Sequence, residues 1–221
     1  MTLSEMLERN ARMFPGKTAL IERTPSLNLR VEISWQDLNS RVNRLANGLM
    51  DRGVRKGDRV VIWMLNSLNW LEAYLGILRT GAWAVPLNHR FTSREFGYCM
   101  DIAEPRAMFL DKEFVAKVEA VGRLFCPVEN IIVAGADIYR RMTGFEDMVF
   151  ASSAGEVIRE VSDQDPCGLY FTSGTTGEPK PILLMHKNME CAAITEVVHG
   201  LRRPGDIFVI LKPLYHTGDK M

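Results

Sequence analysis

The pattern of apolar and polar residues predicts helices and strands that alternate along most of the chain. Between residues 35 and 49 the apolar positions recur with the 3.6-residue period of a helix, in one stripe formed by Trp35, Leu38, Val42, Leu45 and Leu49. The almost wholly apolar run 60–65 comes next, and its length and β-branched start are typical of a strand that is covered on both faces. A second helix is then predicted by the leucine stripe Leu68, Leu71, Leu75 and Leu78.

The same alternation continues toward the C-terminus. The predicted elements are a strand at 82–86, a helix at 93–103, a strand at 107–110, a helix at 114–121, and strands at 131–133 and 167–171. Residues 151–166 are small, polar and acidic, which predicts a surface connection. Such alternation is typical of an α/β fold, with a largely parallel sheet flanked by helices.

Three predicted helix starts carry a hydroxyl residue that is followed three positions later by an acid. At such a start the hydroxyl oxygen accepts a hydrogen bond from a free backbone N–H of the first turn. The pairs are Thr2 with Glu5, Ser34 with Asp37, and Thr92 with Glu95.

Charge and cysteine content exclude several classes of function. The 27 Lys and Arg residues are balanced by 27 Asp and Glu residues, so there is no basic excess with which to bind nucleic acid. The four cysteines stand singly, as reduced cytosolic thiols do, and neither they nor the four histidines have metal-ligand spacing. The start lacks a signal-peptide pattern, and no uncharged apolar run could span a bilayer. We therefore expect a cytoplasmic protein without a transmembrane segment.

The strongest candidate for a binding site is the loop from Thr172 to Lys180, which follows a predicted strand. It contains four hydroxyl side chains, two glycines and a lysine. Glycine lets the backbone approach a phosphate, hydroxyl and N–H groups donate to its oxygens, and Lys180 adds a positive charge. The same residue types are common in ordinary turns, so composition alone leaves an unrelated surface loop open. The loop also lacks the glycine that precedes the lysine of a Walker motif.

The order of residues from Thr172 to Lys180 closely resembles the phosphate-binding signature of the adenylate-forming (AMP-binding) enzymes. This superfamily comprises acyl-CoA synthetases, luciferases and peptide-synthetase adenylation domains. Further stretches that resemble it, in the same order along the chain, are residues 41–46, 53–60, 76–82 and 85–88. The resemblance implies that residues 1–221 are part of the N-terminal AMP-binding domain of an acyl-CoA synthetase-like fold, and that the C-terminal domain is absent.

The resemblance also implies roles for individual residues. It assigns the ATP phosphates to Thr172, Ser173, Gly174, Thr175, Thr176, Gly177 and Lys180, and it puts the Thr172 hydroxyl near a magnesium ion. Pro181 stands where the family usually has glycine. Proline fixes φ and removes a backbone donor. Residues 213–216 resemble the next signature, near the acyl pocket, so His216 is the candidate catalytic residue. Asp219 lies too close to the loop to be the ribose-binding acid, and His186 is expected to serve structure.

The implied activity is that of an ATP-dependent, AMP-forming ligase that joins a carboxylic acid to coenzyme A through an acyl-adenylate. Three alternatives stay open: a peptide-synthetase adenylation domain, a nucleotide-binding module without catalysis, and a structural or partner-binding remnant of the fold. The segments that bind adenine, ribose and most of the magnesium in the superfamily are missing, so we expect the chain alone to be inactive. An incomplete parallel sheet also predicts self-association through exposed apolar surface.

Overall fold

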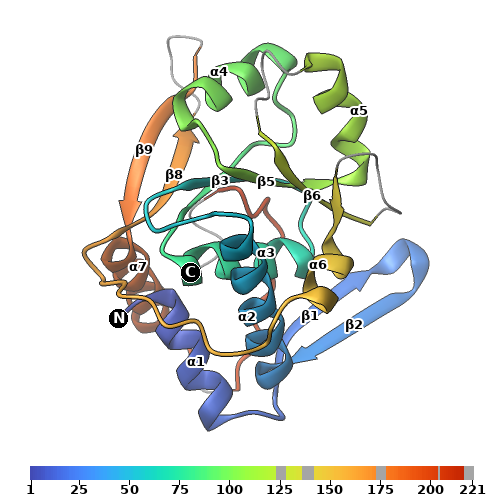
Figure 1. Cartoon of the computed structure of the whole chain (residues 1–221). Helices are drawn as coiled ribbons and strands as arrows, with labels where there is room; N and C mark the ends of the chain where they lie inside the picture. Colours follow the sequence, from blue (N-terminus) through green and yellow to red (C-terminus); the bar gives the residue numbers. More distant parts are fainter. Residues whose placement is uncertain (123–127, 136–141, 173–177, 204, 217–221) are drawn as a thin grey trace.

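The computed structural model describes residues 1–122, 128–135, 142–172, 178–203 and 205–216. Through the middle of this part of the chain runs a seven-stranded sheet with the order β7-β6-β5-β3-β4-β8-β9 (Figure 1). Neighbouring strands are parallel except for β8 and β9, which confirms the predicted largely parallel sheet. The strands are β3 (Arg59–Trp63), β4 (Trp83–Pro86), β5 (Ala107–Asp111), β6 (Asn130–Ala134), β7 (Thr143–Gly144), β8 (Pro166–Thr172) and β9 (Lys180–Met185).

Helices cover both faces of this sheet. On one face lie α2, α3 and α6, and on the other lie α4 and α5, while α1 and α7 pack together near the N-terminus (Figure 1). The helices are α1 (Leu3–Met13), α2 (Trp35–Asp51), α3 (Leu68–Thr80), α4 (Ser93–Ala103), α5 (Lys112–Val121), α6 (Phe145–Ala151) and α7 (His186–His199).

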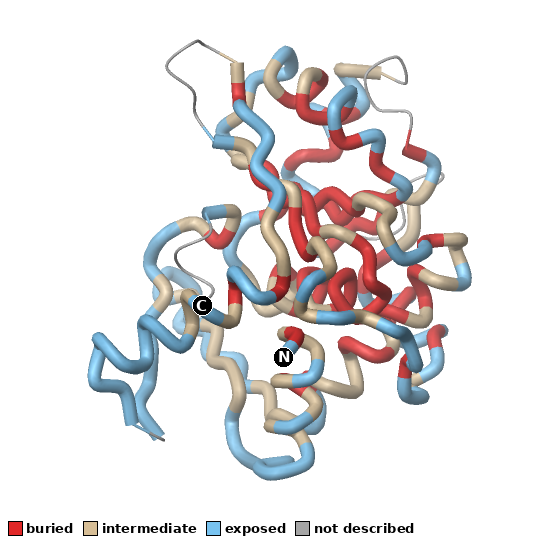
Figure 2. The backbone as a smooth tube through the Cα atoms, turned by 90° about the vertical axis from the view of Figure 1, so that its left-hand side faces the viewer, coloured by how far each residue is buried: buried red, intermediate tan, exposed pale blue. Residues whose placement is uncertain are grey.

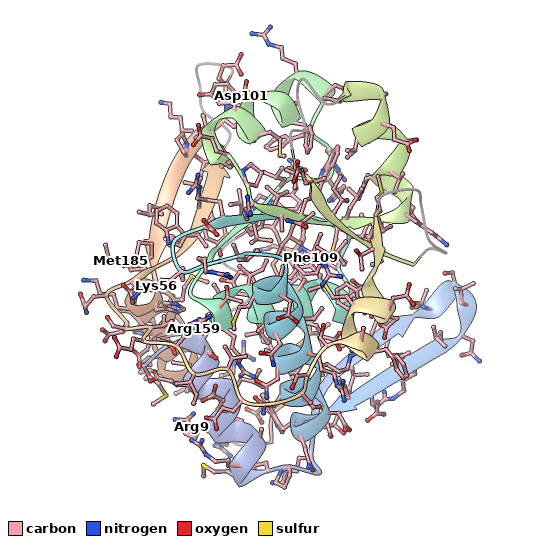
Figure 3. All side chains as sticks on the ribbon, in the orientation of Figure 1. Arg9, Lys56, Asp101, Phe109, Arg159 and Met185 are labelled. Atoms are coloured by element: carbon pink, nitrogen blue, oxygen red, sulfur yellow. The ribbon has the colours of Figure 1, made fainter. Side chains whose placement is uncertain are left out.

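Alternate residues of the central strands enter two separate hydrophobic cores. In β3, Val60 and Ile62 pack on the side of α2 and α3, whereas Val61 and Trp63 pack on the side of α4 and α5. The buried residues accordingly concentrate along the sheet and the helix faces against it (Figure 2), and Phe109 of β5 lies at the centre (Figure 3). The nearly uninterrupted apolar sequence of each strand follows from this two-sided burial.

The predicted helix starts are confirmed by the side-chain caps. Thr2 and Thr92 each accept a hydrogen bond from the backbone of the acid three residues later, and that acid accepts one from the backbone N–H of the threonine. Ser34 accepts from the backbone N–H of Asp37 at the start of α2. These caps satisfy backbone donors that have no partner within the helix.

A β-hairpin that the pattern did not predict lies beside the main sheet. Strands β1 (Thr18–Thr24) and β2 (Leu29–Ser34) pair antiparallel around a short 3₁₀ turn, Pro25–Leu27. Asn28, at positive φ, ends the turn. Most of β2 is exposed, so its sequence lacks the continuous apolar run that marks the central strands.

The chain changes direction between β3 and β4. The connection after β3 forms α3 on one face of the sheet, whereas the connection after β4 forms α4 on the opposite face. The segments that leave the carboxyl ends of these two strands therefore go to opposite faces of the sheet, an arrangement for which a crevice is expected between them, and we call this place the crevice. Open α/β sheets bind ligands at such a switch point, so the carboxyl ends of β3, β4 and their neighbour β8 define the candidate site.

Candidate functional site

Hydrogen bonds fix the chain segments that leave β3 and β4 at the switch point. The indole nitrogen of Trp63, the last residue of β3, donates to the carbonyl oxygen of Asn88 at 3.1 Å. Its ring stacks on Phe96 and Phe114, with centroid distances of 4.4 and 5.1 Å. Trp63 thus belongs to the core and also joins the segments that leave β3 and β4.

A segment near the C-terminus of the described chain is hydrogen-bonded to Asn66, which follows β3. The Asn66 amide nitrogen donates to the carbonyl oxygen of Lys212 at 2.8 Å, and the backbone nitrogen of Leu214 donates to the Asn66 amide oxygen at 2.8 Å. Leu214 itself is only 2% exposed and packs in the core on the α3 side. Residues 212–216 therefore lie at the switch point although they are distant from β3 in sequence.

The candidate catalytic residue His216 belongs to a cluster of three rings. The Tyr215 ring lies 4.4 Å from the His216 ring and 5.5 Å from the His89 ring, with the second pair edge to face. His89 follows β4, and burial, aided by the positive charges of Arg90 and Lys117, lowers the pKa of its imidazole. The cluster therefore presents a neutral His89 at neutral pH beside an exposed His216.

An aspartate at the carboxyl end of β5 holds the neighbouring β3 segment. One carboxylate oxygen of Asp111 accepts a hydrogen bond from the backbone nitrogen of Leu65 at 2.6 Å. Burial raises the pKa of Asp111 to about 6, although the bond from Leu65 acts in the opposite direction. The carboxyl ends of β3 and β5 are thereby tied together next to Asn66.

The candidate loop runs from Thr172 on β8 to Lys180 on β9, and these two residues face each other across the β8–β9 ladder. Thr172 is the residue opposite Lys180 in the register, and its hydroxyl donates to the Lys180 carbonyl oxygen at 3.5 Å. Both residues are exposed. Five predicted site residues, Ser173, Gly174, Thr175, Thr176 and Gly177, lie outside the described part of the chain.

Two residues next to the loop show how it is attached. Glu178 forms an ion pair with Arg94 of α4 at 2.7 Å, so the return of the loop lies beside the helix that follows β4. Pro181 stands opposite Phe171 on β9, at the edge of the described sheet. A strand at an edge tolerates proline because its outward side needs no donor, so the departure from the family glycine is compatible with the ladder.

The donor groups at the base of the loop fit a magnesium-bound triphosphate. The exposed Lys180 ammonium suits phosphate oxygens, and a threonine hydroxyl is a hard oxygen ligand for Mg²⁺. Within the described ranges no group of three or more His, Cys, Asp or Glu side chains is arranged to hold a metal.

The structure joins the predicted site residues into two groups. Thr172 pairs with Lys180, while His216 joins Tyr215 and His89, and no hydrogen bond or ring contact links the groups in the part of the chain described. Sequence reasoning missed Asn66 and His89. Asn66 directly follows the predicted strand 60–65, and His89 comes three residues after the predicted strand 82–86. These positions were the available signal, because residues just beyond parallel strands line the carboxyl edge of the sheet.

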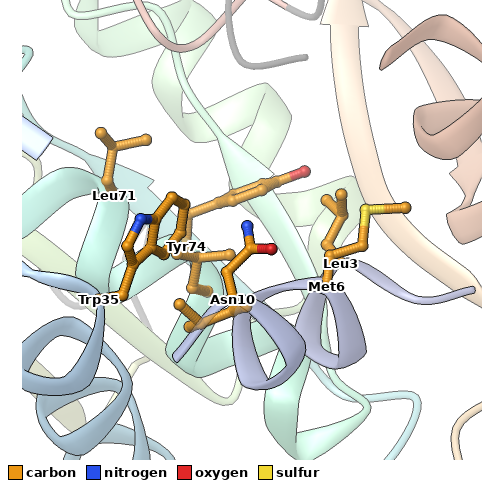
Figure 4. A pocket seen from close by; sticks show the side chains of 8 residues that line it. Leu3, Met6, Asn10, Trp35, Leu71 and Tyr74 are labelled. Carbon is orange, nitrogen blue, oxygen red and sulfur yellow. The ribbon is translucent and has the colours of Figure 1, made fainter. Parts of the chain in front are cut away.

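A separate pocket lies among the helices on the α2 and α3 side of the sheet. It has a volume of about 170 Å³ and opens between α1, the start of α2, and α3 (Figure 4). Asn10 is the one amide among apolar and aromatic side chains, and no candidate-site residue contributes. The lining residues are Leu3, Met6, Leu7, Asn10, Trp35, Leu71, Tyr74 and Leu75.

The fold is that of an open α/β protein, and comparison with known families gives its class. The family model described as AMP-binding enzyme matches residues 7–219. The chain belongs to the AMP-binding enzyme family.

Similar proteins within that family are CoA ligases. The chain is 31% identical over 193 residues to the 3-hydroxybenzoate–CoA/4-hydroxybenzoate–CoA ligase of Thauera aromatica, which covers 87% of this chain and 37% of that protein. It is 30% identical over 221 residues to the long-chain-fatty-acid–CoA ligase FadD13 of Mycobacterium tuberculosis, which covers 96% and 40%. The chain therefore spans about two fifths of the length of these curated relatives.

Solved structures of CoA ligases share the fold. The anthranilate CoA ligase AuaEII, in complex with anthranoyl-AMP, superposes with a TM-score of 0.81 at 28% identity, covering 89% of this chain and 37% of that one. The inhibitor-bound N-terminal domain of FACL13 from Mycobacterium tuberculosis superposes with a TM-score of 0.81 at 25% identity, covering 97% and 52%. The predicted α/β fold of the N-terminal part of an acyl-CoA ligase is confirmed. In the described ranges no helix is long and apolar enough to cross a membrane.

Proposed function

We propose that this chain is the nucleotide-binding part of an AMP-forming carboxylic acid–CoA ligase, made up of residues 1–221 of its N-terminal domain. The observation that carries the proposal is the pairing of Thr172 with Lys180 on β8 and β9, beside β4 and the switch point. This pairing sets a hydroxyl and an ammonium group at the base of a loop whose sequence resembles the family's phosphate signature. The similarity to CoA ligases favours CoA over a carrier domain as the acyl acceptor.

The reaction of such a ligase begins when a substrate carboxylate attacks the α-phosphorus of ATP and pyrophosphate leaves. The CoA thiol then attacks the acyl-adenylate, and AMP leaves. Both reactants of the first step are anions, so the protein acts mainly by positioning and by electrostatics. Magnesium, when bound with ATP, supplies positive charge to the phosphate oxygens.

The chain's own residues have distinct parts in this proposal. Lys180 and the loop residues would bind the phosphates, and the Thr172 hydroxyl would be a ligand of the magnesium ion. His216 lies at the crevice where the acid meets the nucleotide and is the proposed catalytic residue. The relatives act on both aromatic and long-chain fatty acids by name, so the proposal assigns no particular acid. It places the reaction in the cytoplasm, in keeping with the single, scattered cysteines.

Calorimetry of magnesium-ATP binding to this chain tests the proposal. The wild type is expected to bind weakly, and Lys180→Ala is expected to abolish binding because it removes the charge at the loop base. Lys17→Ala is the matched control, since it removes one exposed lysine that lies before β1. Binding that survives Lys180→Ala, or no binding by the wild type, would overturn the assignment of this chain as a nucleotide-binding unit.

A second experiment separates the proposed ligase from a binding module without catalysis. A longer chain that includes the remaining length of the relatives is assayed for pyrophosphate release that depends on added acid. The ligase proposal expects acid-dependent release from the longer chain and none from the present chain alone. ATP binding without any acid-dependent release by the longer chain would favour the non-catalytic module.

A further inference from the structure

We propose that Asn66 is the positioning residue for His216, and that its amide holds residues 212–214 so that the His216 ring stays in the crevice between the carboxyl ends of β3 and β4. The inference rests on the proposed function only in giving His216 its catalytic part. The geometric claim concerns Asn66, Leu214 and the three-ring cluster and stands by itself.

The Asn66 amide binds the backbone as a neighbouring strand would. Its NH₂ group donates to the carbonyl oxygen of Lys212 and its oxygen accepts from the backbone nitrogen of Leu214, both at 2.8 Å. Both bonds have the length of good hydrogen bonds. A carboxamide is the side chain that offers a donor and an acceptor together at this reach, so one residue satisfies two backbone groups of the same segment.

Asn66 is itself held firmly from both sides. The preceding residue, Leu65, donates its backbone N–H to Asp111 at 2.6 Å. The following residue, Ser67, caps α3 by accepting from the backbone nitrogen of Trp70 at 3.1 Å. Asn66 therefore projects from a short segment whose two ends are fixed to β5 and to α3.

On the N-terminal side of the segment that Asn66 holds, Ile210 packs against the core and the Arg202 guanidinium lies over the Phe208 ring at 4.8 Å. Residues 207–211 have no regular secondary structure, and Ile207, Val209 and Leu211 are 77%, 67% and 87% exposed. The side chain of Leu214 is buried in the core, and the backbone nitrogen of His216 donates to the Pro213 carbonyl oxygen at 3.1 Å in a turn. The two hydrogen bonds of Asn66 and the buried Leu214 side chain therefore set where the turn and its two rings lie.

The ring cluster reports whether the two hydrogen bonds of the Asn66 amide are intact. Tyr215 lies between His216 and His89, with centroids 4.4 and 5.5 Å away, so a shift of the segment alters the ring currents at both imidazoles. His89 belongs to the β4 side and is not part of the segment that Asn66 binds. Its signal therefore measures the position of the segment and not just local changes at the mutated residue.

The test is nuclear magnetic resonance of the histidine ring protons in this chain and in Asn66→Ala. The signals of His216 and His89 are expected to move toward the values of an unstructured histidine, and the titration midpoint of His89 is expected to rise as its ring becomes more hydrated. Asn69→Ala, the same change three residues further on in α3, is the matched control and should leave both signals in place. Buried His186 reports that the fold is intact.

Asn66→Asp keeps the test decisive if the alanine variant fails to fold. The carboxylate still accepts from Leu214 but cannot donate to the Lys212 carbonyl, so a partial shift of the same two signals is expected. Unchanged His216 and His89 signals in either folded variant would overturn the proposal. Because neither ATP nor an acid is needed, this result is independent of the calorimetric test of Lys180.

Discussion

At the scale of single residues, charged side chains around the buried Glu72 connect the helices of the layer that contains α2 and α3. Arg41 of α2 donates two hydrogen bonds to Glu72 of α3, at 2.7 and 2.9 Å, and further bonds to Glu146 of α6. The Glu72 side chain is 2% exposed. A carboxylate so deeply buried needs its partner, because an unpaired charge in this position keeps its full desolvation cost.

Arg41→Ala is therefore expected to destabilise the fold strongly. Removing one partner of a buried pair costs about 3 kcal/mol or more in the free energy of unfolding. Urea denaturation followed by circular dichroism measures the change. The double variant Arg41→Met with Glu72→Gln should recover much of the loss, because it leaves no buried charge, and a double variant as unstable as the single one would contradict this account.

His186 predicts a dependence of stability on pH. It begins α7, is 1% exposed, and its Nδ1 has no hydrogen-bond partner in the described structure. Burial lowers its pKa from 6.5, although the charges of Asp165, Glu5 and Asp163 act against this and the N-terminal amine acts with it. The folded state thus prefers the neutral imidazole, so its contribution is present above the unfolded pKa and is lost as pH falls through the folded one.

The free energy of unfolding should accordingly decrease below about pH 6.5, by at most about 1.4 kcal/mol per pH unit for one proton. His186→Gln should flatten this slope, and urea titrations at several pH values compare the two proteins. Asp111 contributes a pH dependence of stability with the opposite sign, because its raised pKa favours the folded state at low pH. The informative quantity is therefore the difference in unfolding free energy between wild type and His186→Gln at each pH. Parallel curves would refute the role of His186.

At the scale of elements, the position of β8 depends on a close approach between backbones. Gly168 is the residue of β8 that pairs with Ala84 of β4. A Cβ atom there would lie 2.6 Å from the Tyr170 ring and 3.1 Å from the Ala84 carbonyl oxygen. Backbone cannot move aside as a flexible side chain can, so only glycine lets β8 join the parallel strands at this register.

Gly168→Ala is expected to weaken the contact of β8 with β4 and to destabilise the protein by about 1–3 kcal/mol through overpacking. Gly16→Ala is the control, since a Cβ atom at Gly16 meets nothing within 4 Å. Hydrogen exchange should show faster opening of the β8 and β9 amides in Gly168→Ala only. Equal protection in both variants would mean that the β8 backbone has more room than its contacts indicate.

The helices and strands also differ in how well the sequence predicts them. The helix predicted at 93–103 has those bounds in the structure, because its cap and its apolar stripe are both local signals. The β1–β2 hairpin was missed because its strands are only partly covered, and the order of strands in the sheet was not predicted because periodicity identifies a buried face but not its neighbour. Asn66 was missed for a related reason: its partners, Lys212 and Leu214, are 146 and 148 residues away.

At the scale of the whole molecule, apolar surface gathers on α7 and on the segment after it. Val197, Val198 and Leu201 are at least half exposed, as are most of residues 207–211. The run Ile-Phe-Val-Ile-Leu at 207–211 has high β-propensity and contains no charge, glycine or proline. Its backbone lacks a strand partner in the described structure, so a second copy of this chain is the occupant that we expect there.

Self-association is therefore expected for the isolated chain, and sedimentation velocity over a range of concentrations measures it. Val209→Lys should shift the chain toward monomer because it puts a charge into the segment. Phe150→Lys, which changes a 90% exposed residue of α6, should leave the association as it is. A wild type that sediments as a monomer at every concentration would disprove the expectation.

The two groups of candidate-site residues differ in the sequence separation between the residues that are in contact. Thr172 and Lys180 are eight residues apart, whereas Asn66 and Leu214 are separated by 148. Closing the longer loop costs about 2.5 kcal/mol more in chain entropy, and such non-local contacts form slowly. The pairing of Thr172 with Lys180 should thus form early in folding, and the contact of Asn66 with residues 212–214 should form last.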